Sequence, residues 1–182
     1  MSEQNNAPDI MERINQVLTG DAQKNALDLA AFLRENDIWL EFNKDEDSNL
    51  AMWCGAVGGI VGNSIGFLLI NGDENFPGPW TFWFNSCDFE GSKNVDEEFK
   101  NAIWAFTSPC GKCNPNWEKC RGSDKRTILG KEFEEQCHSP LTFCNPSAET
   151  LKNMKRLLIY LKPEIDSIQA EIERERANVE TK

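Results

Sequence analysis

Cysteine is concentrated in one stretch of this sequence, and cysteine thiolates either bind metals or carry out thiol chemistry. Two residues separate Cys110 from Cys113, a spacing that lets both thiolates contact one metal ion. A structural zinc ion takes four such ligands. We predict a zinc site whose ligands are Cys110, Cys113, Cys120 and Cys137, with Cys144 or His138 as substitutes.

Three other interpretations of these cysteines remain open. Cys110-Gly111-Lys112-Cys113 has the length of a dithiol redox site, although it follows a predicted helix rather than opening one, and a helix N-terminus is what usually lowers the thiol pKa. A nucleophilic cysteine would need His138 as its base, because the chain has no other histidine. The cysteines also fit free thiols that pack as small apolar groups.

The charge of the chain is unevenly distributed. The formal net charge is −11, yet the stretch from Cys110 to Lys131 holds six basic residues and only Glu118 and Asp124 as acids. Basic neighbours stabilise thiolates, and we expect this basic stretch to contact an anionic ligand or protein partner. The acidity of the whole chain argues against nucleic acid as a partner.

Tryptophan is the second residue type with a chemical use here. Trp39, Trp53 and Trp83 are predicted to share one face of a sheet and to line a pocket for a small ligand. A packed aromatic core explains the same residues. No His-Glu-x-x-His pattern or serine nucleophile elbow is present, so the sequence names no catalytic residue and favours a binding protein over an enzyme.

Helical periodicity predicts the elements that must position these residues. Apolar residues share a face over residues 10–18, 21–35 and 96–107. Gly20 is expected to stop the first of these helices, and Asp21 to cap the second. Asn145-Pro146 reads as a helix start before an apolar stripe that contains Leu151, Met154, Leu158 and Leu161.

Pro163 is expected to separate that helix from a last, charged helix within residues 163–180. Its apolar face, with Ile165, Ile168 and Ile172, predicts docking on the body of the protein or pairing with a second chain.

Alternating apolar residues predict strands at 38–42, 50–54, 65–70 and 80–84, with short strands at 127–133 and 140–143. Residues 50–72 carry no charge, but acidic residues flank them on both sides. We therefore interpret them as two buried strands joined by a glycine-rich turn rather than as a membrane span.

The predicted fold class is α+β, with an antiparallel sheet flanked by N- and C-terminal helices and a cysteine-rich irregular lobe. We expect a single domain over 1–182, composed of helices and meander at 1–107, the lobe at 108–146 and the C-terminal helices at 147–182. The first residues lack a basic and then apolar leader, so we expect a cytoplasmic protein.

The last third of the chain resembles an uncharacterised family of small bacterial proteins with a cysteine cluster. The resemblance is carried by Gly130-Lys131-Glu132-Phe133, Cys137, Leu141-Thr142-Phe143, Asn145-Pro146 and Glu149-Thr150-Leu151. It implies a bacterial origin and no assigned activity.

Overall fold

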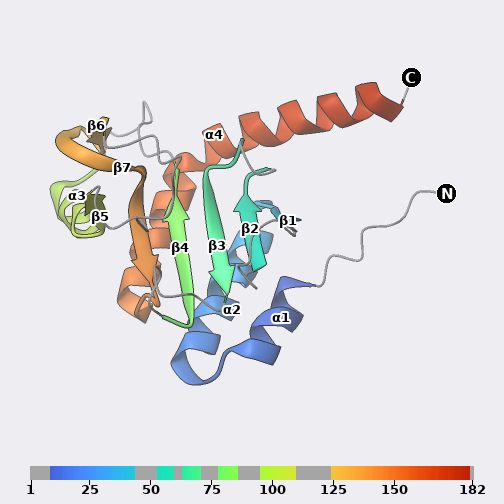
Figure 1. Cartoon of the computed structure of the whole chain (residues 1–182), viewed down its shortest axis with the longest axis horizontal. Helices are drawn as coiled ribbons and strands as arrows, with labels where there is room; N and C mark the ends of the chain where they lie inside the picture. The colour runs from blue at the N-terminus through green and yellow to red at the C-terminus, as the bar shows by residue number, and fades with distance from the viewer. Residues whose placement is uncertain are drawn as a thin grey trace, which may run out of the picture.

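A computed structural model describes residues 9–43, 53–59, 63–70, 78–85, 95–109 and 124–180. In chain order its elements are α1 (Ile10–Val17), α2 (Gly20–Glu35), β1 (Leu40–Asn43), β2 (Trp53–Val57), β3 (Gly66–Ile70), β4 (Trp80–Phe84), α3 (Glu97–Trp104), β5 (Thr107–Pro109), β6 (Asp124–Ile128), β7 (Lys131–Cys144) and α4 (Ala148–Glu180). The fold class is α+β, as predicted (Figure 1).

The strands form one antiparallel sheet in the order β1-β2-β3-β4-β7-β5, and β6 pairs with β7. The first four strands follow one another as a meander, whereas β7 enters from late in the sequence and pairs with β4. The helices α1 and α2 and the long helix α4 pack behind this sheet in Figure 1. The predicted flanking of the sheet by N- and C-terminal helices is therefore confirmed.

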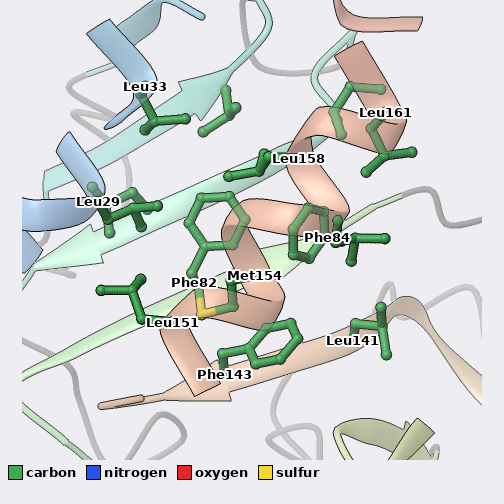
Figure 2. Packing of buried hydrophobic residues seen from close by; sticks show 14 of the residues in the cluster. Leu29, Leu33, Phe82, Phe84, Leu141, Phe143, Leu151, Met154, Leu158 and Leu161 are labelled. Atoms are coloured by element: carbon green, nitrogen blue, oxygen red, sulfur yellow. The ribbon is translucent and has the colours of Figure 1, made fainter. Parts of the chain in front are cut away.

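The core lies between one face of the sheet and α2 and α4. Leu68, Phe82 and Phe143 occupy one cross-strand row, and all three are fully buried. Figure 2 shows Phe82 and Phe143 of this row covered by Leu29 and Leu33 of α2 and by the apolar stripe of α4, which includes Leu151, Met154, Leu158 and Leu161. The predicted stripe of residues 151–161 is therefore confirmed as core.

The helix α4 runs through Pro163 without a break, so the prediction of two separate helices is wrong. Proline removes one N–H and strains the turn before it, which kinks a helix but does not always end it. The residue four positions earlier, Ile159, is 45 % exposed, so the turn that meets the proline ring lies at the surface. Beyond the proline, Ile165 and Ile172 are buried against the body.

Two predicted caps are also wrong. Thr19, not Asp21, is the N-cap of α2, and Asp21 lies in its first turn. At α4, the Ser147 Oγ accepts a hydrogen bond from the Thr150 N–H, whereas Asn145 lies outside the helix with a φ of 43°. Serine and asparagine are similarly favoured as N-caps, so cap preference alone does not distinguish Ser147 from Asn145.

The short strands predicted at 127–133 and 140–143 are one hairpin instead. The strand β6 turns at Leu129-Gly130 into β7, which continues from Lys131 to Cys144. Both turn residues have positive φ, 50° and 81°, as a two-residue hairpin of the primed type requires. Leucine seldom adopts this conformation, and here its side chain is buried in the core.

Candidate functional site

Residues 110–123, called here the cysteine-rich stretch, are flanked by two residues that pair with the same position of β7. Pro109, the last residue of β5, and Asp124, the first of β6, both have Gln136 as their Cα partner. A strand has two edges, so β5 and β6 flank β7 on opposite sides, about 10 Å apart. Residues 110–123 therefore leave and rejoin the sheet on either side of Gln136, the residue that precedes Cys137.

The strand β7 is irregular at this position. Arg126 pairs with Phe133 but Asp124 pairs with Gln136, so β7 has one residue more than β6 over this interval. Glu135 has a φ of 52° and marks the bulge. Bulges redirect the neighbouring side chains, and here the redirected positions include Gln136 and Cys137.

Gln136 carries a polar group that is not satisfied in the structure. Its side chain is 5 % exposed, and its Nε2 donates to the Glu134 carbonyl oxygen at 3.1 Å. The Oε1 is buried, and none of the described residues donates a hydrogen bond to it. A buried acceptor without a donor costs about 1–3 kcal/mol, so this position favours a bound group that can donate.

Two of the predicted ligands are described, and they lie apart. Cys137 is half-buried and Cys144 is exposed, both as free thiols. Cys144 pairs with Thr81 at the C-terminal end of β7, seven residues after Cys137, a separation that spans roughly 20 Å along an extended strand. Zinc lies about 2.3 Å from each sulfur, so the structure does not bring Cys137 and Cys144 to one ion.

The other predicted ligands, Cys110, Cys113, Cys120 and the side chain of His138, lie outside the described residues. Over the residues that the structure describes, no group of three His, Cys, Asp or Glu side chains is arranged to hold a metal ion. The four-ligand site therefore stays a prediction.

The positive charge next to Gln136 is largely compensated. Lys125 of β6 contacts Glu132 at 2.9 Å and Glu134 at 3.6 Å. The hydrogen bond that Lys125 donates to Glu132, followed by the charges of both glutamates, raises the pKa of Lys125. Lys131 lies over the rings of Trp104 and Phe133, at 4.8 and 4.9 Å from their centroids. Glu132 and Glu134 directly follow the basic stretch in the sequence, and the hairpin brings both of them to Lys125.

The three candidate tryptophans come from different parts of the fold. Trp53 pairs with Ile70, and Trp83 pairs with Phe67. The side chain of Trp53 lies outside the described residues, so a face shared by Trp39, Trp53 and Trp83 stays a prediction.

Trp39 lies in a different setting, at the rim of a groove of about 640 Å³. The groove is formed by the start of α1, the end of α2, β1 and the second half of α4. Its lining includes Arg34, Gln169 and Glu173, which sequence reasoning missed. Gln169 is 130 residues away from Trp39 along the chain, and no local pattern links such positions.

Comparison with known proteins found no matching family model, no matching curated protein and no matching solved structure. Among the helices that the structure describes, none is long and apolar enough to cross a membrane.

Proposed function

We propose that this protein is a binding or adaptor protein in which a zinc ion fixes the shape of a cysteine-rich contact surface. The ligands would be Cys110, Cys113, Cys120 and Cys137, with His138 as the alternative donor. One observation supports the proposal: Pro109 and Asp124, the described residues on either side of residues 110–123, both pair with Gln136, which precedes Cys137.

The closed ends reduce what the metal must supply. Bringing the ends of a flexible segment together costs conformational entropy. Here the pairing of Pro109 and Asp124 with Gln136 already holds the two ends close together, so zinc binding does not have to supply that free energy. Zinc binding would then order only the residues between them, since ligand binding energy at structural sites acts as folding energy.

The contact surface would be the basic residues between the cysteines. Residues 110–123 contain the basic residues Lys112, Lys119 and Arg121. Lys125 lies outside this range and forms ion pairs with Glu132 and Glu134. An anionic ligand or an acidic protein segment is the matching partner. The proposal includes a cytoplasmic location, where free thiols such as Cys137 and Cys144 stay reduced.

The test uses the two described cysteines as a matched pair. We expect about one zinc per chain, by elemental analysis, in untagged protein purified under reducing conditions. Cys137→Ser should lose most of the bound zinc, and Cys144→Ser should keep it. Cys113→Ser gives a second variant away from the sheet, and near-UV circular dichroism checks that each variant is folded.

Equal zinc content in Cys137→Ser and Cys144→Ser would contradict the proposed ligand set. Absence of zinc together with a fast-reacting Cys110–Cys113 pair in a thiol assay would favour the thiol–disulfide redox function instead. If the protein contains no metal and all of its thiols react slowly, both the zinc proposal and the redox alternative are contradicted.

A further inference from the structure

The groove beside Trp39 is separate from the cysteine-rich stretch. It lies at β1, the first strand in the sheet order, whereas β5 is the last. Its volume of about 640 Å³ falls within the range of small-molecule sites, about 300–1,000 Å³. Any ligand of this groove would therefore be independent of the proposed zinc site.

The floor of the groove is apolar. Ile10, Leu33 and Ile38 are almost fully buried, and Leu40 and Phe42 of β1 are half-buried beside them. Transfer of apolar surface from water to such a floor is favourable by roughly 25 cal/mol per Å². The floor therefore favours a ligand with an alkyl or aryl part.

The rim of the groove is acidic. Asp9, Asp37 and Glu173 face one cation, Arg34, which already contacts Asp9 at 3.7 Å. In the described ranges neither Asp37 nor Glu173 forms an ion pair. Two carboxylates are thus left at the rim without a protein cation, and they favour a positively charged ligand group.

The rim is held in place by α4. The Gln169 Oε1 accepts a hydrogen bond from the main-chain N–H of Trp39 at 3.2 Å. The Gln169 Nε2 donates one to the main-chain carbonyl oxygen of Asp37 at 3.1 Å. Both bonds join α4 to the turn between α2 and β1. The groove is therefore formed before any ligand arrives, which lowers the cost of binding.

Trp39 also shows that its indole accepts a cation. The guanidinium carbon of Arg176 lies 5.8 Å from the Trp39 ring centroid, and Arg176 is paired with Glu41. Arg176 therefore already takes a cation–π position on the Trp39 ring, and the preference of the groove for a cation rests on the carboxylates of its rim.

We propose that this groove binds a small organic amine, a protonated nitrogen linked to an aryl or alkyl group. The apolar part would lie on Ile10, Leu33 and Phe42, and the ammonium would lie between the carboxylates of Asp37 and Glu173, near the Trp39 indole. An anionic ligand of the same shape is repelled by these carboxylates.

Three probes of equal shape test the charge. The full chain is titrated with 3-phenylpropan-1-amine, 3-phenylpropan-1-ol and 3-phenylpropanoate, and binding is followed by ligand-observed NMR. We expect the amine to bind about 3- to 10-fold more tightly than the alcohol, as one partly screened charge pair provides, and the carboxylate to bind most weakly.

Matched variants test the place. Glu173→Gln and Asp37→Asn should each weaken the amine by about 3- to 10-fold and leave the alcohol unchanged. Asparagine tolerates the positive φ of 54° at position 37, so that variant is expected to fold. Glu175→Gln removes a carboxylate from the same helix outside the groove and should change nothing.

Equal affinity for amine and alcohol, or an equal effect of Glu173→Gln and Glu175→Gln, would overturn the proposal, as would a failure of all three probes to bind at millimolar concentration. The zinc content of the protein is not affected by any of these results, so failure here and failure of the zinc proposal are distinguishable.

Discussion

At the residue scale, Gly66 lies so close to the next strand that a side chain does not fit. A Cβ at this position would lie 2.4 Å from the Trp83 carbonyl oxygen, a main-chain atom of β4. Gly130 offers the contrast, because its φ is 81° but nothing lies within 4 Å of a Cβ there. Gly66→Ala thus tests a clash and Gly130→Ala tests backbone strain alone.

We expect Gly66→Ala to lower the free energy of unfolding by about 3 kcal/mol, as overpacking against main chain does, and Gly130→Ala by about 1 kcal/mol. Urea denaturation of both variants measures this difference. Equal costs would mean that β3 and β4 separate easily, contrary to a close-packed sheet.

Asp96 predicts a pH dependence. It caps α3 by accepting from the Phe99 N–H at 2.9 Å, and it pairs with Arg156 of α4. The hydrogen bond from Phe99, then the one from Arg156, lowers the pKa of Asp96. A carboxyl whose pKa is lowered by folding stabilises the protein above its unfolded pKa of about 3.9, and this contribution is lost as the pH falls through the folded pKa.

Asp96→Asn keeps a capping side chain but removes the charge. We expect the variant to be less stable than wild type at pH 7 and the difference to shrink steadily below about pH 4. Urea denaturation across this pH range measures it. A difference that stays constant at low pH would mean that Asp96 acts through the cap alone.

At the element scale, the second half of α4 is part of the body rather than a free extension. A Cβ at Gly59 would lie 2.4 Å from the Ile172 Cδ1, and one at Gly58 would lie 3.3 Å from the Ile165 Cγ2. Glycines in this turn therefore let α4 approach the end of β2 closely. This packing accounts for Gly58 and Gly59 of the glycine-rich turn.

Ile172→Ala tests this packing. Ile172 is 3 % exposed, so truncation should lower the free energy of unfolding by about 2–4 kcal/mol. Val179, near the end of the same helix, is 75 % exposed, and Val179→Ala should change stability by no more than about 0.5 kcal/mol. Denaturation curves of the two variants compare them directly, and equal small effects would show that the distal helix does not dock.

The sequence predicted elements well where one face is apolar throughout. The stripes of α2, α3 and α4 and the alternation of β4 all correspond to buried side chains. It failed where tertiary packing overrode a local preference: Leu129 adopts positive φ because its side chain is buried, and Pro163 stays helical because Ile165 and Ile172 pack beyond it. Propensity alone does not contain such contacts.

At the scale of the whole molecule, the sites arise from contacts between distant parts of the chain. The sequence pointed to the cysteines, but the pairing of Pro109 and Asp124 with one glutamine depends on the bulge in β7. The Trp39 groove needs α4 beside the α2–β1 turn. Neither arrangement has a periodic signal, so residue types could be predicted and their juxtaposition could not.

The same architecture predicts how far the loss of a metal would spread. The hairpin of β6 and β7 has a turn end and an open end. At the turn end, Ile128 and Leu129 are buried in the main core. At the open end, the base of the cysteine-rich stretch, Asp124 pairs with Gln136. The strands β1–β4 are joined by their own pairing, and α4 is held by the main core and by its hydrogen bonds with the α2–β1 turn. Chelation should therefore loosen the base and leave the core intact.

Hydrogen exchange of the full chain, with and without a chelator, measures this. We expect faster exchange at 107–109, 124–126 and 133–137, an effect that fades toward Leu129, and unchanged protection in β3, β4 and residues 151–161 of α4. Loss of protection everywhere would make the metal part of the global fold, and no change anywhere would contradict a structural metal. A chelator effect on exchange that is largest near Gln136 and fades toward Leu129 would support the proposal. It would mean that the sheet holds the two ends of residues 110–123 and that the metal acts only between them.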